Sequence, residues 1–352
     1  MYLISSERDG EWIYDPGMAM ALQEYVRHNI FLDDDVLFPY MMHPVVQIGR
    51  FQNAYEEVNQ PYMDEHNIQI VRRDTGGGAI YLDDQNMSFC FLLEGDNDIY
   101  GNYARLYEPA IKALEKLGVK NLEQKGRNDL LLDGKKVSGA AMMLEKGRIY
   151  AGYSLSLDAN YEAMATVLHP NQKKIESHGI QSVRSRVGSL RSHLAPEYQD
   201  MTVWEFSDFM MCELLGVDDL SEAKRYVLTE EDWAEVDKLC AEKYKNWDWN
   251  YGSFKEFTYQ VTERFPVGTI SIGLSIEHGK ISDIQITGDF FGLQSIQEVE
   301  NTLIGTRLKK DALLQALDDL EISTYFGDIS KETFVNYMLS IPTESEEVKK
   351  EG

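Results

Sequence analysis

The sequence predicts an α+β fold, with a mixed β-sheet in a large first domain and a smaller α+β domain after it. Apolar, strand-like runs occur in pairs with turn residues between them, and amphipathic helical segments separate the pairs. The length of 352 residues is more than one ordinary domain requires. A hydrophobic content of 43% is enough to fill the cores of two globular domains.

The first domain is expected at residues 1–248 and begins with a clearly marked helix. Asp15 is suited to cap this helix, Pro16 fits its first position, and apolar residues follow at helical spacing. Another helix begins at Thr229, where the sequence resembles a capping box. The remaining strands and helices of this domain are expected at residues 45–48, 68–71, 87–93, 104–117, 130–132, 137–144, 148–157 and 203–215.

A second, accessory domain is expected at residues 249–342. Its strands and helices are predicted at residues 257–265, 269–276, 280–286, 295–303 and 309–317. A three-stranded sheet with helices on one face accounts for this order. The polar residues 343–352 are expected to form a disordered tail.

The composition argues against several classes of function. Lys and Arg total 34 against 59 Asp and Glu, and this net charge of −25 predicts no binding to nucleic acid. No apolar run reaches the ~18 residues of a membrane span, and residues 1–7 do not read as a secretory signal. Cys90, Cys212 and Cys240 lack metal-type spacing and cannot all form disulfides with one another, which favours a reducing compartment. We therefore expect a cytoplasmic protein that does not bind membranes.

The most informative motif is the run Arg-Arg-Asp-Thr-Gly-Gly-Gly at residues 72–78, which follows a strand-like segment. Three glycines permit positive φ and let backbone N–H groups approach the anionic oxygens of a ligand. Arg72 and Arg73 add planar guanidinium groups that suit phosphate or carboxylate. The motif indicates a nucleotide or acyl-phosphate site, although an ordinary tight turn would contain the same glycines.

A second motif lies at residues 126–141. Asp133 and Gly134 predict a hairpin turn that brings Lys136 toward Asn128 and Asp129. Asn and Asp oxygens are ligands that Mg²⁺ accepts beside substrate phosphates. A cation next to a carboxylate and a run of small residues suits a site that stabilises developing negative charge. Two solvated lysines at a turn remain the alternative for residues 135–136.

Taken together, these motifs resemble the lipoate–protein ligases, relatives of the biotin–protein ligases. The matching stretches occur in the family's order at residues 48–53, 72–81, 126–129, 136–139, 173–174 with 179–187, and 247–252. The resemblance covers roughly residues 1–255 and weakens beyond. It implies a mixed-sheet catalytic domain of the biotin/lipoyl ligase type with a small accessory domain.

The resemblance also implies an activity. Lipoate's carboxylate would attack ATP to give lipoyl-AMP, and a lysine of an acceptor protein would then take the lipoyl group. ATP is implied as a substrate and Mg²⁺ as a cofactor. The implied partners are lipoyl domains of 2-oxoacid dehydrogenase E2 subunits and the glycine cleavage H protein.

Site residues follow from the same resemblance. Lys136 is the implied catalytic residue, and Asn128 and Asp129 are implied ligands of the metal. The implied contacts to lipoate and ATP are Arg73, Gly76, Gly77, Gly78, Ala79, Ile80, Tyr81 and Lys136. Contacts to phosphate or to the acceptor are implied for Lys173, Lys174, Arg184 and Arg186.

Two alternatives stay open at this point. An amidotransferase or octanoyltransferase of the same fold would carry the acyl group on a cysteine and need no ATP. Cys90 lies in an apolar strand-like run, which does not favour a reactive thiol. A non-enzymatic lipoate-binding protein would have no use for the Lys136, Asn128 and Asp129 set.

Overall fold

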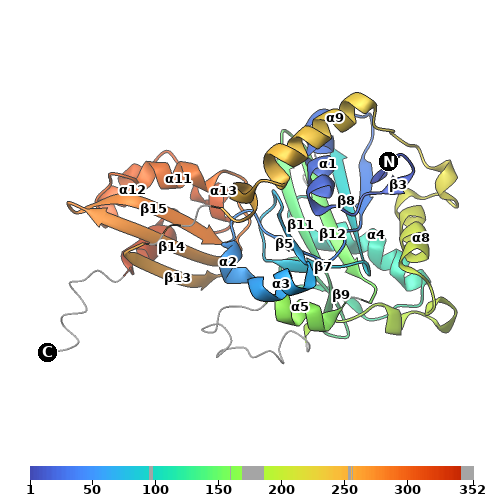
Figure 1. Cartoon of the computed structure of the whole chain (residues 1–352). Coiled ribbons are helices and arrows are strands. Elements are labelled where there is room, and N and C mark those ends of the chain that lie inside the picture. Colours follow the sequence, from blue (N-terminus) through green and yellow to red (C-terminus); the bar gives the residue numbers. More distant parts are fainter. Residues whose placement is uncertain (95–97, 159, 169–185, 253–254, 256, 342–352) are drawn as a thin grey trace. The chain divides into compact units, whose positions relative to one another are not determined.

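The structure is a computed structural model that describes residues 1–94, 98–158, 160–168, 186–252, 255 and 257–341 (Figure 1). The chain forms two compact units. The first comprises Met1–Ile48, Ala54–Arg73 and Ala79–Tyr251, and the second comprises Gly49–Asn53, Asp74–Gly78 and Gly252–Gly352. The two short loops of the N-terminal half that belong to the second unit have no counterpart in the sequence-based domain prediction.

A seven-stranded sheet forms the centre of the first unit. Its order is β1 (Tyr2–Leu3), β4 (Val36–Tyr40), β8 (Asn86–Glu94), β12 (Arg148–Ser156), β11 (Lys135–Glu145), β10 (Asp129–Leu132) and β9 (Leu122–Lys125). β1 and β4 are parallel, whereas the other neighbours are antiparallel. The sheet is therefore mixed, as the sequence predicted.

Both faces of this sheet are buried. In β8, Phe89 and Phe91 point into one apolar cluster while Cys90 and Leu92 point into the other, which explains why this strand is a continuous apolar run. The helices α4 (Tyr103–Lys116) and α8 (Val203–Leu215) contribute to the first cluster. The second is built with α1 (Pro16–Asn29) and α9 (Glu230–Leu239).

The predicted helix starts are present. Asp15 caps α1 by accepting a hydrogen bond from the backbone N–H of Met18 at 2.9 Å, and Pro16 is the first helical residue. Thr229 and Asp232 form a capping box at the start of α9. A π-helical turn, η4 (Cys240–Tyr244), follows α9 directly.

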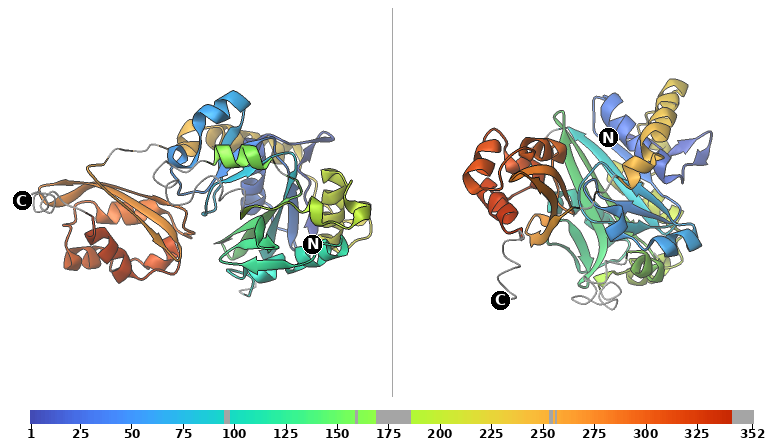
Figure 2. Two further views of the ribbon diagram at one scale, coloured as in Figure 1. Left: turned by 90° about the horizontal axis from the view of Figure 1, so that it is seen from below. Right: turned by 60° about the vertical axis from the view of Figure 1, so that its left-hand side comes forward.

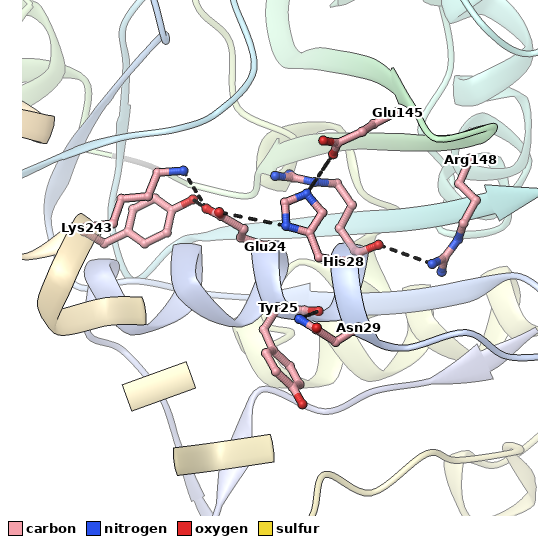
Figure 3. A network of polar contacts seen from close by, with 9 residues as sticks. Glu24, Tyr25, His28, Asn29, Glu145, Arg148 and Lys243 are labelled. Carbon is pink, nitrogen blue, oxygen red and sulfur yellow. Dashed lines mark hydrogen bonds and ion pairs between the residues drawn. The ribbon is translucent and has the colours of Figure 1, made fainter. Parts of the chain in front are cut away.

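Charged side chains join α1 to the turn end of the β11–β12 hairpin (Figure 3). Glu145 Oε2 lies 2.9 Å from His28 Nε2 and 3.0 Å from Arg27 Nε. Glu24 accepts a hydrogen bond from Lys243 Nζ of η4 at 2.6 Å. These contacts add charge pairing to the apolar packing that holds α1 on the sheet.

The first unit also contains a smaller three-stranded sheet. Its order is β6 (Gln69–Arg72), β5 (Val45–Ile48) and β7 (Ile80–Leu82), with β5 and β6 parallel. Apolar residues on these strands pack with α3 (Gln60–His66) and α5 (Tyr161–Val167). The remaining elements are β2 (Glu7–Arg8), β3 (Glu11–Trp12), α2 (Ala54–Glu57), η1 (Arg191–His193), η2 (Pro196–Tyr198), η3 (Leu220–Glu222) and α10 (Trp247–Asn250).

The second unit contains the antiparallel sheet β13 (Tyr259–Phe265), β14 (Gly268–Glu277) and β15 (Lys280–Gly288). Its helices are α11 (Ile296–Leu303), α12 (Lys310–Ala316), α13 (Ile322–Phe326) and α14 (Lys331–Leu339). They gather on one side of the sheet around a single apolar core (Figure 2). The sequence predicted the three strands and the first two helices but missed α13 and α14. Within the described part of the chain, no helix combines the length and hydropathy that crossing a membrane requires.

Candidate active site

A tight hairpin places Lys136. Asp133 and Gly134 both have positive φ, 49° and 80°, and form the two-residue turn between β10 and β11 that the sequence predicted. A bulge at Val137 of β11 separates the Leu131–Lys136 pair from the Leu130–Ser138 pair, and Asp129 then lies opposite Gly139. The Lys136 ammonium nitrogen is 2.7 Å from Asp129 Oδ1. The turn thus brings the cation and the carboxylate together, as expected.

Gly139 leaves space for the Lys136 side chain. A Cβ atom at position 139 would lie 3.0 Å from Lys136 Nζ and 3.1 Å from its Cε. Any larger residue would therefore move the ammonium group rather than the backbone. The small residue is part of how this strand positions the cation.

Asn128 is held firmly against β11. Its Nδ2 donates to the carbonyl oxygen of Ala140 at 2.5 Å, and its own carbonyl oxygen accepts from the Tyr107 hydroxyl at 3.2 Å. Tyr107 also contacts Ser138 Oγ at 3.0 Å, and burial raises the pKa of its hydroxyl. Because Tyr107 stays neutral, it serves as a fixed hydrogen-bonding group behind Asn128 and Asp129.

The backbone of Lys136 has a second support that the sequence did not reveal. Beyond the end of β12, Val187 forms a parallel bridge with Lys136, and the Gly188 N–H donates to the Lys136 carbonyl oxygen at 2.8 Å. The Tyr161 hydroxyl of α5 donates to the Gly188 carbonyl oxygen at 2.6 Å. A Cβ atom at Gly188 would lie 3.0 Å from Lys135 Cβ, so glycine permits this close approach.

The two arginines of the first motif lie in different surroundings. Arg73 Nη1 donates to the Gln47 carbonyl oxygen at 3.1 Å, and burial lowers the pKa of its guanidinium to about 10, so it remains charged at neutral pH. Arg72 is buried and bonds to the backbone of Trp249 and Asn250. The sequence suggested both guanidinium groups as anion ligands, and the structure gives Arg72 protein partners instead.

Each glycine of the triple-glycine loop has its own structural setting in the second unit. A Cβ atom at Gly76 would lie 2.3 Å from the Phe290 carbonyl oxygen, so this position serves close backbone packing. Gly77 has a φ of 97° and donates its N–H to the same carbonyl at 3.3 Å. A Cβ atom at Gly78 would meet no described atom within 4 Å. Internal packing therefore leaves room for a side chain at Gly78 that it does not leave at Gly76.

The remaining predicted contacts are partly core residues. Tyr81 and Ile80 lie on β7, and Tyr81 is buried in the apolar cluster around α3 and α5. Ala79 packs at the edge of the same cluster. Lys173, Lys174 and Arg184 lie outside the described residues, whereas Arg186 is exposed beside Val187.

The three cysteines are free thiols. Cys90 lies on β8 opposite Gly152 of β12 and is buried, and burial raises its pKa to about 12. Burial likewise raises the pKa of Cys240, to about 11, and raises that of Cys212. Such thiols are not ionised near neutral pH. No group of three or more His, Cys, Asp or Glu side chains among the described residues is arranged to hold a metal ion.

Sheet, hairpin and loop together define a protein of the lipoyl protein ligase A/B class. The model of that catalytic domain matches residues 15–215, and the model of the bacterial lipoate protein ligase C-terminus matches residues 255–338. The chain belongs to the lipoate–protein ligase family. It is 54% identical over 340 residues to lipoate–protein ligase 2 of Staphylococcus aureus, which covers 97% of this chain and 100% of that protein.

Two solved structures are similar as well. A crystal structure of lipoate-protein ligase A bound with ATP is 25% identical with a TM-score of 0.57, and the match covers 71% of this chain and 98% of that one. A structure of a bi-partite lipoate protein ligase and its E2 lipoyl domain from Thermoplasma acidophilum is 25% identical with a TM-score of 0.61. That match covers 73% of this chain and 98% of the other.

Proposed function

We propose that this chain is an ATP-dependent lipoate–protein ligase that forms lipoyl-AMP and transfers the lipoyl group to a lysine of an acceptor protein. The observation that carries the proposal is the Lys136–Asp129 pair, held at 2.7 Å by the hairpin of a chain that belongs to this family. The pair supplies a fixed cation where an adenylation site requires one.

In the first step, a carboxylate oxygen of lipoate attacks the α-phosphorus of ATP. A P–O bond forms, the bond to the β-phosphate bridging oxygen breaks, and pyrophosphate leaves. Negative charge gathers on the α-phosphate oxygens, and Lys136 is the residue that stabilises it. Arg73, charged at neutral pH, holds the carboxylate and nucleotide in place. The loop at Gly76, Gly77 and Gly78, continued by Ala79, Ile80 and Tyr81, contributes backbone contacts to the ligands.

In the second step, the neutral amine of the acceptor lysine attacks the acyl carbon. An amide bond forms, the bond to the AMP oxygen breaks, AMP leaves with its negative charge, and the amine nitrogen releases one proton to water. Lys136 stabilises the charge that develops on the acyl and phosphate oxygens. An unactivated carboxylate would not acylate an amine near neutral pH, which is the chemical reason for the preceding adenylation.

Mg²⁺ fits the donor set beside Lys136. Asp129 supplies one carboxylate and Asn128 an amide oxygen, and Mg²⁺ commonly takes one or two carboxylates together with substrate phosphates. The ion would neutralise phosphate charge when bound. Asp129 would then have both the ion and Lys136 as neighbours, so its orientation by the hairpin matters for both.

The partners follow from the acceptor chemistry. We propose lipoyl domains of 2-oxoacid dehydrogenase E2 subunits and the glycine cleavage H protein as acceptors, which is supported by the E2 lipoyl domain in the Thermoplasma acidophilum structure. Arg186, with Lys173, Lys174 and Arg184 outside the described residues, is the proposed contact to acidic groups of substrate or acceptor. Nucleic acid and membranes are not proposed partners, and three free thiols fit a cytoplasmic location.

The thioester alternative receives no support from the cysteines. It needs a thiolate at the acyl site, whereas burial keeps Cys90 protonated. The non-enzymatic alternative predicts binding of lipoate without turnover.

One assay separates these functions. Purified protein is incubated with lipoate, ATP and a lipoyl acceptor domain, and pyrophosphate and acceptor mass are measured. The ligase releases pyrophosphate only with lipoate present, and the acceptor gains one lipoyl group only with ATP. Lipoylation without ATP from an acylated donor protein would favour the amidotransferase, and binding without either product would favour the non-enzymatic protein.

A further inference from the structure

Arg72 is enclosed by the short helix α10 of the same unit. Its Nε donates to the Trp249 carbonyl oxygen at 2.7 Å, and its Nη2 donates to the Asn250 carbonyl oxygen at 2.8 Å. Its backbone N–H donates to Asn250 Oδ1 at 2.8 Å, and its carbonyl oxygen accepts from Trp249 Nε1 at 3.0 Å. Trp249 and Asn250 thus bind the side chain of Arg72 and both of its backbone polar groups.

These contacts take the place of a neighbouring strand. β6 is an edge strand that pairs with β5 on one side, where the Arg73 N–H donates to the Ile48 carbonyl oxygen at 3.0 Å. On the other side, the N–H and carbonyl of Arg72 are satisfied by the Asn250 amide and the Trp249 indole. Such groups need partners when buried, and α10 supplies them 177 and 178 residues away in sequence.

The partners of Arg72 are themselves fixed. Asn250 Nδ2 donates to the Tyr244 carbonyl oxygen at 2.6 Å, and Asn250 is 6% exposed. Arg72 is 5% exposed, and its guanidinium bonds to neutral carbonyl oxygens of the backbone. A buried charge held in this way has one favourable arrangement, so it fixes the direction of the strand end.

Arg73 is the next residue, and successive side chains of a strand point to opposite faces. We propose that Trp249 and Asn250, by binding Arg72, act as positioning residues for Arg73 and thereby for binding of the acyl carboxylate during adenylation. This inference rests on the proposed role of Arg73 as a substrate contact. It gives Trp249 and Asn250, two residues of the Trp-Asp-Trp-Asn-Tyr-Gly motif, a function in the reaction without direct substrate contact.

Two tryptophans of α10 provide a matched test. Trp249→Phe removes the indole N–H that bonds to Arg72 and keeps an aromatic ring. Trp247→Phe makes the same change two residues away, where the residue is 60% exposed and its ring stacks on Tyr251 with the ring centroids 3.9 Å apart. We expect Trp249→Phe to raise the KM for lipoate roughly 10- to 100-fold, because small displacements of a binding group have effects of that size. Trp247→Phe should match the unaltered protein, and the KM for acceptor should stay unchanged in both.

A double-mutant cycle links the effect to Arg73. Arg73→Lys is combined with Trp249→Phe, and kcat/KM for lipoate is measured for both single variants and the double variant. If Trp249 acts through Arg73, the double variant is no worse than Arg73→Lys alone. Arg72→Lys, which loses the fork to α10 and keeps the charge, should reproduce Trp249→Phe and provides the test if that variant does not fold.

The outcomes separate the two claims. Full activity of Arg73→Lys and Arg73→Ala would refute the proposed role of Arg73 itself. A second outcome would overturn the positioning inference alone. In that outcome the Arg73 variants are impaired, whereas Trp249→Phe and Arg72→Lys behave like Trp247→Phe. Additive losses in the cycle, or a lowered melting temperature with an unchanged KM, would also overturn it, since both indicate a purely structural contact.

Discussion

The Lys136 ammonium lies 2.7 Å from Asp129 Oδ1 across the two-residue turn of the β10–β11 hairpin. The side chains are 36% and 39% exposed, and ion pairs exposed to that extent contribute little to stability. Their position is nevertheless defined closely by the bulge in β11, by Gly139 and by the Gly188 hydrogen bond to the strand. The pair is well positioned but contributes little to the stability of the fold. A site that stabilises developing charge requires such a preorganised group.

Removing the cation should abolish activation of lipoate. Lys136→Ala is expected to lower the rate of lipoate-dependent pyrophosphate release roughly 100-fold or more, because a preorganised charge stabiliser is lost. Lys135→Ala is the matched control, since that exposed lysine is the strand neighbour and its side chain points to the other face. Equal activity of the Lys136 and Lys135 variants would mean that the second motif is a solvated turn.

Displacing the same cation without removing it should have a similar effect. Gly139→Ala places a methyl group 3.0 Å from the Lys136 ammonium, so the flexible end of the lysine must move. We expect a loss of about 10- to 100-fold in kcat/KM, with a change in unfolding free energy of about 1 kcal/mol or less.

The control for Gly139→Ala is the same substitution made in the Lys136→Ala variant. In that variant, Gly139→Ala should cause no further loss of kcat/KM, because the Lys136 ammonium that it would displace is already absent. A further loss of the same size would show that position 139 affects something other than the lysine.

Local signals made the hairpin and the first helix predictable. Asp133 and Gly134 specify their own turn, and Asp15 and Pro16 specify a helix start, so neither depends on distant residues. β4 escaped prediction because Pro39 lies within it. The strand tolerates the proline because the short neighbour β1 pairs only with residues 36–37, which leaves the N-side of Pro39 without a required donor.

Long-range contacts were beyond sequence reasoning. Arg72 looked like a second anion ligand because its partners, Trp249 and Asn250, come from the far end of the domain. Gly76 looked like a ligand-facing glycine, whereas its lack of a side chain also permits packing against Phe290. For Arg72 and for Gly76, the residue type indicates which interactions are possible. Only the folded structure shows which partner each residue contacts.

The glycine loop gives a further prediction at Gly78. Because a methyl group there meets no described atom within 4 Å, Gly78→Ala should leave thermal stability unchanged while weakening binding of ATP or lipoate. Calorimetric titration measures both affinities. Unchanged affinities would assign the loop to packing alone, and Gly76→Ala, which clashes with Phe290, serves as the contrasting variant that lowers stability.

Chelation of divalent ions should stop adenylation. Asp129 and Asn128 offer too few ligands to retain Mg²⁺ by themselves, so the ion is expected to arrive with ATP. Excess EDTA should abolish pyrophosphate release, and added Mg²⁺ should restore it. Full activity in EDTA would remove the metal from the proposal and leave Lys136 and Arg73 as the charge-stabilising groups.

Cys90 should be dispensable for activity. Its thiol is buried and its pKa is raised to about 12, so it is not a nucleophile near neutral pH. Cys90→Ala is expected to retain ATP-dependent lipoylation at a stability cost of about 1 kcal/mol for the lost sulfur. Loss of acyl transfer in a variant that still folds would revive the thioester route.

The path of oxygen through the reaction tests the central claim most directly. Lipoate labelled with ¹⁸O in both carboxylate oxygens is converted with unlabelled ATP and an acceptor domain, and the AMP product is analysed by mass spectrometry. Attack of the carboxylate on the α-phosphorus followed by loss of AMP at the acyl carbon predicts AMP that carries one ¹⁸O atom. Unlabelled AMP accompanied by a lipoylated acceptor would contradict lipoyl-AMP as the intermediate.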